Sequence, residues 1–402
     1  MSLCIRPLLP LLKFATAALL LASFLIAQPK ARVVLVSVDG LDYRYLRDRD
    51  KLGLKIPNLR RLLREGEWAS GVVGEVPTIT WPAHTTLLTG VPPSVHGIQA
   101  NQRWDYSLIK CPTLWDALRR NGLTSAAITW PVTVNAPVTW NLPEYFEKRQ
   151  GGAMDLAAIR KHATPGLLDE ISAAYPSFAQ QWMDDRTRTL AAVFLIERKH
   201  PDFLAVHLVD LDAEEHDTEP FSPASNAMLE YTDELIGRIL AAVPATAIFA
   251  LVSDHGFAAV DKTVYPAAGT ATGGLVLAHT ATEAAELAKL AQDPANGIGR
   301  RVSSQEWKRF MPGTEKPAAV YEPAERYLFS PKALDGRYGK PHEAGVHGLW
   351  PGRPEYRSVF LLRGPGIQPG QTGEISMLEI APRLNEILIG KRVPPGAIGR
   401  DK

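Results

Sequence analysis

The sequence contains almost no cysteine. Its 402 residues include only Cys4 and Cys111, and Cys4 lies in an N-terminal segment that we expect to be removed. The mature chain then has one thiol, which excludes an internal disulfide and with it the small disulfide-stabilised scaffolds. Stability must come from a hydrophobic core, which a chain of this length can bury.

An excess of charge of either sign is also missing. The sequence has 44 basic and 43 acidic residues, a net charge of +1 and no run of basic residues. Proteins that bind nucleic-acid duplexes place clustered positive charge against the phosphate backbone. We therefore expect no binding to a nucleic-acid duplex, while the composition leaves the oligomeric state open.

A long hydrophobic run occurs only at the N-terminus. Arg6 and Lys13 precede an apolar run from Phe14 to Ala27, which has the length of a signal peptide and is short for a membrane span. We expect residues 1–27 to be a cleaved signal peptide, which predicts a periplasmic or secreted protein with no stable membrane span. An uncleaved anchor that begins at Leu8 is the alternative.

Beyond this segment, short β-branched runs alternate with segments of helical periodicity. The expected strands cover residues 33–38, 124–130, 202–210, 246–256 and 355–367, and the expected helices cover 56–66, 113–122, 186–200, 225–243 and 377–390. Such alternation predicts an α/β fold with a mostly parallel central sheet and helices on both faces. Residues 28–261 and 341–402 would form this core. Residues 262–340 would form a small inserted cap subdomain, with a polar helical stretch at 283–310 and a stretch broken by prolines at 316–331.

Acidic and histidine side chains follow the expected strands. Ligands bind beyond the carboxyl ends of the strands in open α/β sheets, although a single aspartate there is usually a turn or cap residue. Carboxylate and imidazole together are ligands that zinc prefers, and this collection is large enough for two ions. Asp210 and Asp212 compete for one ligand position. The candidates are Asp39, Asp210, Asp212, His216, Asp254, His255 and His347.

Thr80, in the stretch TWPAH, has two interpretations. A threonine before tryptophan and proline at a helix start is usually a cap of the first backbone N–H groups. It could instead be a nucleophile, because a nearby divalent ion lowers the pKa of a hydroxyl and a helix N-terminus favours anions. Two ions ~4 Å apart suit in-line displacement at phosphorus, so the expected ligands favour the nucleophile.

Four ordered motifs resemble the nucleotide pyrophosphatase/phosphodiesterase family of the alkaline phosphatase superfamily. They are PTITWPAHTTLLTGVPPSVHGIQAN at 77–101, VDLDAEEHDTEP at 209–220, SDHG at 253–256 and GVHG at 345–348. The similarity extends from Arg32 to the C-terminal helix. Ala83 and Glu219 depart from the family's usual Asn and Gly, and these departures leave the substrate open.

The resemblance implies a set of site residues. Thr80 would be the nucleophile, Asn101 would bind the substrate and steady a phosphoryl oxygen, and Trp81 would form an aromatic wall. Two zinc ions are implied as cofactors. Their ligands would be Asp39, Thr80, Asp254 and His255 for one ion, and Asp212, His216 and His347 for the other.

The function implied is an exported phosphodiesterase or nucleotide pyrophosphatase that acts through a phospho-threonine intermediate. The uncharged amide of Asn101 suits a phosphate with one negative charge, hence a small phosphodiester or nucleotide substrate. One alternative is a phosphomonoesterase or phosphonate hydrolase, with Arg103 binding the additional charge. The other is a catalytically inactive binding module on the same fold.

Overall fold

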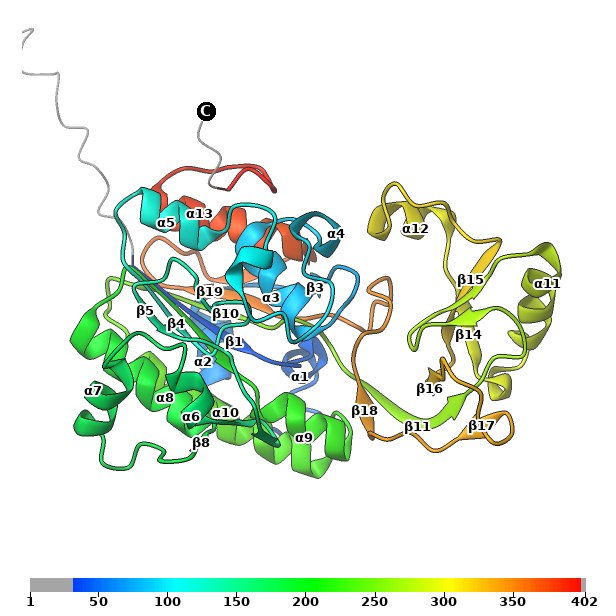
Figure 1. Ribbon diagram of the computed structural model, residues 1–402, viewed down its shortest axis with the longest axis horizontal. Helices are drawn as coiled ribbons and strands as arrows, with labels where there is room; N and C mark the ends of the chain where they lie inside the picture. Colours follow the sequence, from blue (N-terminus) through cyan, green and yellow to red (C-terminus); the bar gives the residue numbers. More distant parts are fainter. Residues whose placement is uncertain (1–31, 399–402) are drawn as a thin grey trace, which may run out of the picture. The chain divides into compact units, whose positions relative to one another are not determined.

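The centre of the molecule is an eight-stranded sheet (Figure 1), given by a computed structural model that describes residues 32–398. From edge to edge the strands are β20 (Gly370–Thr372), β2 (Glu67–Ala69), β19 (Phe360–Arg363), β10 (Ile248–Val252), β1 (Val33–Val38), β9 (Phe203–Leu208), β4 (Ser125–Ile128) and β5 (Trp140–Leu142).

The sheet is mixed. Strands β10, β1, β9, β4 and β5 pair in parallel with one another, whereas β19 runs antiparallel to both β10 and β2. Strand β1 is buried along its whole length between β9 and β10, as the apolar run 33–38 predicts for a strand covered on both faces. Its carboxyl end therefore opens beside those of β9 and β10.

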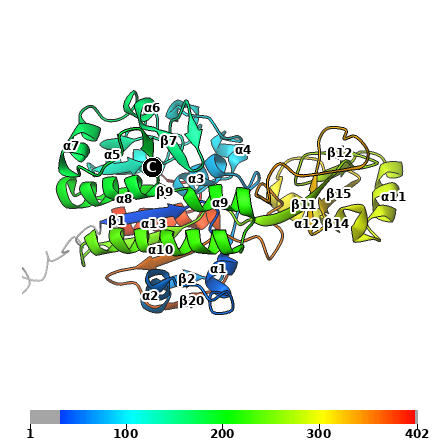
Figure 2. The same ribbon diagram turned by 90° about the horizontal axis from the view of Figure 1, so that it is seen from below.

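Helices cover both faces of this sheet and bury the alternating side chains of β1. Val34, Val36 and Val38 pack in one core cluster with α2 (Pro57–Glu65), α8 (Asp185–Phe194) and α10 (Pro223–Ala242). Val33 and Leu35 pack in the other cluster with α3 (Thr80–Thr89), α5 (Leu114–Arg120) and α13 (Ile380–Ile389). Figure 2 shows α8 and α10 running alongside β1. The expected helices thus form where their apolar periodicity meets the sheet.

The remaining elements are short connections around the core. The helices among them are α1 (Tyr43–Arg47), α4 (Pro93–His96), α6 (Leu156–Arg160), α7 (Leu167–Ala174) and α9 (Asp210–Thr218). The strands are β3 (Val72–Val73), β6 (Arg149–Gln150), β7 (Ala153–Asp155), β8 (Trp182–Met183) and β21 (Ile375–Ser376).

The segment after β10 builds further small sheets. Strand β11 (Ala258–Val264) pairs with β16 (Arg326–Phe329), β17 (Tyr338–Gly339) and β18 (Gly345–Val346). A four-stranded sheet consists of β12 (Thr270–Ala271), β13 (Val276–Ala278), β15 (Ala319–Pro323) and β14 (Ile298–Arg301). The predicted boundary at 262 falls within β11, and the described residues belong to one compact unit. The division into core and cap stays a prediction.

One expected helical stretch is only partly helical. Residues 283–310 contain the end of α11 (Ala281–Leu290) and all of α12 (Ser304–Phe310), but β14 lies between them. A turn at Pro294 and Gly297 interrupts the periodicity, and Gly297 has φ of +77°, which a residue with a side chain adopts at a penalty.

The expected signal peptide, residues 1–27, lies outside the described residues. Within 32–398, no helix is both long enough and apolar enough to cross a membrane.

Candidate active site

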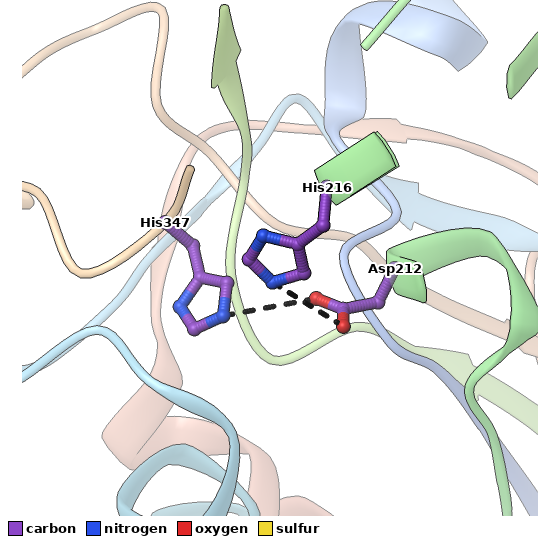
Figure 3. A group of neighbouring side chains, drawn as sticks. All are labelled: Asp212, His216 and His347. Carbon is purple, nitrogen blue, oxygen red and sulfur yellow. Dashed lines mark ion pairs between the residues drawn. The ribbon is translucent and has the colours of Figure 1, made fainter. Parts of the chain in front are cut away.

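The predicted ligands form two groups at the carboxyl edge of the central sheet. Asp39 follows β1, and Asp254 and His255 follow the neighbouring strand β10; these three make the first group. Asp212 and His216 lie one turn apart on α9 and meet His347, which follows β18, in the second group (Figure 3). Within each group the ligand atoms lie within 4.8 Å of one another.

The first group is deeply buried and has unsatisfied polar atoms. His255 Nε2 lies 3.3 Å from Asp39 Oδ1 and 3.1 Å from Asp254 Oδ2, yet none of these three atoms has a hydrogen-bond partner. Buried polar atoms are normally satisfied, because leaving them unpaired is costly. Three such atoms within 4.8 Å of one another fit a bound cation.

The second group adjoins the first. His216 Nε2 lies 3.6 Å from Asp212 Oδ2, and His347 Nε2 lies 3.8 Å from Asp212 Oδ1. His216 Nδ1–H donates to the carbonyl oxygen of Gly345 (3.0 Å), which turns Nε2 toward Asp212, as for a metal-binding imidazole. The rings of His347 and His255 stack with centroids 3.9 Å apart, so the two groups form one continuous cluster.

Burial and like charge perturb the pKa values of these groups. Burial, with the nearby charge of Asp39, raises the pKa of Asp212 to about 7. The same two causes raise the pKa of Asp254 well above its usual value. Burial and the charge of His216 lower the pKa of His347 to about 4. Without a bound cation, the site therefore disfavours ionised Asp212 and Asp254 and protonated His347. A divalent cation would favour ionised carboxylates beside neutral imidazoles.

Asp210 does not join either group. Its Oδ2 accepts a hydrogen bond from the backbone N–H of Asp185 (3.1 Å), and its Oδ1 lies 3.6 Å from the guanidinium of Arg188. Asp212, four residues before His216, shares a helix face with it. Of the two aspartates, only Asp212 therefore lies in a possible ligand group with His216.

Thr80 is the first residue of α3 but does not cap it. The N-cap is Ile79, and no side chain caps the helix, so the cap interpretation is wrong. Thr80 is 7% exposed and lines a cavity of about 300 Å3 together with Asp39, Asp212 and His347. Thr80 thus shares one cavity with members of both ligand groups, as the nucleophile interpretation requires.

Asn101 and Trp81 lie next to Thr80 and are linked to each other. Asn101 Oδ1 accepts the backbone N–H of Trp81 (3.0 Å), which leaves the Asn101 amide NH2 to donate into the cavity that it lines. Trp81 is only 2% exposed, so the half-buried ring of Phe146 is the more open aromatic surface. Trp104 packs against both rings.

Arg103, predicted as a partner for additional phosphate charge, is exposed and is not among the residues that line this cavity. The cavity instead contains Arg149, on β6.

A larger cavity of about 710 Å3 lies elsewhere and does not contain the ligand groups. Its arginines are bound within the protein: Arg44 pairs with Asp42, and Arg326 pairs with Asp261 and Glu219. The smaller cavity, which is lined by Thr80 and by members of both ligand groups, is therefore the candidate active site.

Sequence reasoning missed His207, which lies behind Asp39. It is fully buried on β9, and its two ring nitrogens donate to Asp39 Oδ2 (3.0 Å) and Glu144 Oε2 (3.1 Å). Burial alone would lower the pKa of His207, but its hydrogen bonds to the two carboxylates outweigh burial and raise it to about 9. His207 in turn lowers the pKa of Asp39 against the effect of burial. The available signal was a histidine within the apolar run FLAVHLV.

Glu144 and His84 complete this buried support and were also missed. Glu144 Oε1 accepts the indole N–H of Trp81 (2.9 Å), so it joins His207 to the residue after Thr80. His84 Nδ1 lies 2.8 Å from the carbonyl oxygen of Thr80, and its Nε2 lies 2.9 Å from Ser37 Oγ on β1. Such outer partners fix the orientation of the residues that act directly.

Comparison with known proteins identifies the family. Residues 33–326 match the family model described as type I phosphodiesterase / nucleotide pyrophosphatase. The chain belongs to this family. The resemblance drawn from the four motifs is thereby confirmed.

Two curated relatives are similar to part of this chain. An uncharacterized pyrophosphatase/phosphodiesterase of Schizosaccharomyces pombe is 24% identical over 254 residues, covering 57% of this chain and 45% of the relative. Venom phosphodiesterase 2 of Crotalus adamanteus is 26% identical over 235 residues, covering 56% and 26%. The matches thus span less than half the length of these relatives.

Among solved structures, murine ectonucleotide pyrophosphatase/phosphodiesterase 5 has a similar fold. An inactive threonine-to-alanine variant in complex with AMP gives a TM-score of 0.61 at 17% identity, over 90% of this chain and 96% of that one. The human protein of the same name gives the same values. The likeness confirms an α/β fold with a mixed central sheet.

Replacing His207 tests the buried support. We expect His207→Phe to lower the free energy of unfolding by about 3 kcal/mol, because Asp39 and Glu144 then stay buried without their shared partner. Urea unfolding monitored by circular dichroism measures this change. The exposed His342 supplies the control, and His342→Phe should change stability by less than about 0.5 kcal/mol. Equal stability of the two variants would contradict the bridging role of His207.

Proposed function

We propose that this protein is an exported phosphodiesterase or nucleotide pyrophosphatase that uses two zinc ions and a phospho-threonine intermediate. The observation that carries the proposal is the placement of Thr80 in one cavity with members of both ligand groups. Two adjoining ligand groups that share a cavity with a hydroxyl suit in-line displacement at phosphorus. Export follows from the expected signal peptide at residues 1–27.

Each proposed zinc ion has its own ligand set. Thr80 joins Asp39, Asp254 and His255 for one ion, and Asp212, His216 and His347 hold the other. These residue types match the oxygen and nitrogen ligands of zinc. Bound there, the ions would supply positive charge next to the reacting phosphate and lower the pKa of the Thr80 hydroxyl.

The chain's own residues perform the transfer. Thr80 Oγ, having lost its proton to solvent, forms a bond to phosphorus while the bond to the leaving oxygen breaks, and that oxygen takes a proton from solvent. The Asn101 NH2 donates to a non-bridging oxygen as charge develops. Water then attacks the phospho-threonine, which releases a phosphomonoester and restores Thr80. His84 and Asn101 hold the start of α3 in place during both steps.

The names of relatives support this proposal. The Crotalus adamanteus protein is named a phosphodiesterase, and the inactive murine neighbour lacks a threonine and binds AMP. Small phosphodiesters and nucleotides are therefore the proposed substrates. We also propose the division into a core of residues 28–261 and 341–402 and an inserted cap of residues 262–340.

The alternatives have less support. A phosphomonoesterase or phosphonate hydrolase was expected to use Arg103, which does not line the cavity. An inactive binding module would not need complete ligand sets, yet every expected ligand position holds a competent residue.

Metal content tests the cofactor. We expect the purified protein to retain about two zinc ions per chain, because the two groups form separate ligand sets. Elemental analysis should find about one ion fewer in Asp39→Ala and in Asp212→Ala. Asp210→Asn is the matched control and should keep both ions. A chelator should abolish turnover and zinc should restore it; full activity of metal-free protein would sink the two-zinc proposal.

Thr80 is tested by a pair of substitutions. Thr80→Ala should remove almost all turnover with little change in Tm, because the side chain caps nothing. Thr80→Ser keeps a hydroxyl and should retain measurable activity. Thr89→Ala, on the same helix, controls for the loss of a threonine and should stay active. Turnover by Thr80→Ala at the wild-type rate would exclude the covalent intermediate.

The uncharged amide of Asn101 predicts a preference for diesters. A monoester brings two negative charges, whereas Asn101 donates hydrogen bonds without adding positive charge. We expect bis-p-nitrophenyl phosphate to have a higher kcat/KM than p-nitrophenyl phosphate. Asn101→Ala should lower kcat/KM by roughly tenfold to a thousandfold, and Arg103→Ala should change neither substrate. A better monoester rate that depends on Arg103 would show the diesterase assignment to be wrong.

A further inference from the structure

One cation in the cavity has no role in the proposed chemistry. Arg149 is the one arginine or lysine among the described residues that line the cavity of Thr80. It lies on β6, which pairs with β7, and it is exposed. Nothing in the transfer at Thr80 uses this charge.

Arg149 forms no ion pair with the described residues of the protein. Across residues 32–398 no carboxylate lies within 4.0 Å of its guanidinium. The guanidinium instead lies over the ring of Phe146, 5.1 Å from its centroid. Stacking on an aromatic face holds the group in place and leaves its N–H edges available. Arg188, by contrast, is fully buried and bound to Asp185.

Most acids of the cavity are already engaged. Glu144 is bound to His207, and Glu343 lies 3.2 Å from His216 Nδ1. Asp39 and Asp212 belong to the ligand groups. Asp217, exposed on α9, is the remaining acid of the cavity and makes no ion pair with Arg149. The guanidinium is therefore available to an anion that enters from outside.

The place of Arg149 sets where that anion would lie. Arg149 lines the same cavity as Asp212, His216 and His347, the three residues of the second ligand group. Thr80 and Asn101 line this cavity too. An anionic group attached to a phosphate at Thr80 can reach it within one cavity.

We propose that Arg149 binds a second phosphate of the substrate, adjacent to the phosphate that Thr80 attacks. A guanidinium fits a phosphate through two parallel N–H···O bonds, and Phe146 orients it for that contact. This inference rests on the proposed function and concerns selectivity within it: Arg149 would favour substrates whose leaving group carries phosphate over diesters whose second substituent is neutral.

A pair of nucleotide esters tests this selection. ATP and p-nitrophenyl thymidine 5′-monophosphate both yield a nucleoside monophosphate on cleavage at the first phosphate, but only the leaving group of ATP carries phosphate. Arg149→Ala should lower kcat/KM for ATP by roughly tenfold to a hundredfold, the effect of a lost charge-assisted hydrogen bond, and should change the nitrophenyl ester by less than about threefold. Arg149→Lys keeps a charge without the paired N–H bonds and should fall between.

Binding without turnover separates this inference from the proposed function. In Thr80→Ala protein, calorimetry should show that Arg149→Ala weakens ADP by roughly tenfold and leaves AMP unchanged; Arg103→Ala should weaken neither. An equal loss for both nucleotides, or no loss for either, would overturn the role of Arg149. If wild-type protein cleaves neither ester while ADP binding still depends on Arg149, the second phosphate site stands and the proposed function falls.

Discussion

The site depends on one electrostatic constraint: three carboxylates and three imidazoles are packed together at a buried sheet edge. Asp39, Asp254 and His255 leave polar atoms without partners, and burial drives the pKa values of Asp212 and His347 in opposite directions. Such a cluster is unfavourable without added positive charge. The proposed pair of divalent ions would supply that charge. The hydrogen-bonded residues around the cluster would hold it in place before the ions bind.

The fold brings the cluster together through neighbouring strands. Strands β1 and β10 run parallel, so Asp39 and Asp254 leave the sheet side by side. Strand β9 places His207 behind Asp39, and the helix that follows it carries Asp212 and His216. Helix α3, which packs on the face of the sheet opposite to α8 and α10, carries Thr80. The candidate metal ligands thus lie at the sheet edge, while the segment around Phe146 and Arg149 adds aromatic and charged lining to the cavity.

Much of this could be predicted from the sequence, because the decisive residues lie next to strong local patterns. Asp39 and Asp254 follow apolar strand runs, and the spacing of Asp212 and His216 places both on one helix face. The contact between His207 and Glu144 could not be predicted, since it joins residues 63 positions apart that only the folded sheet brings together. Likewise Arg149 and Arg103 look alike in sequence; the path of the exposed segments decides which one lines the cavity. The antiparallel direction of β19 also follows from the chain's return path and from no local pattern.

Two metal ions are proposed to occupy these two ligand groups beside Thr80. Anomalous diffraction from crystals of the protein, measured on both sides of the zinc absorption edge, tests this proposal most directly. We expect two zinc peaks ~4 Å apart, one bounded by Asp39, Asp254 and His255 and the other by Asp212, His216 and His347. A single peak, or zinc bound away from these residues in crystals grown with zinc, would contradict it.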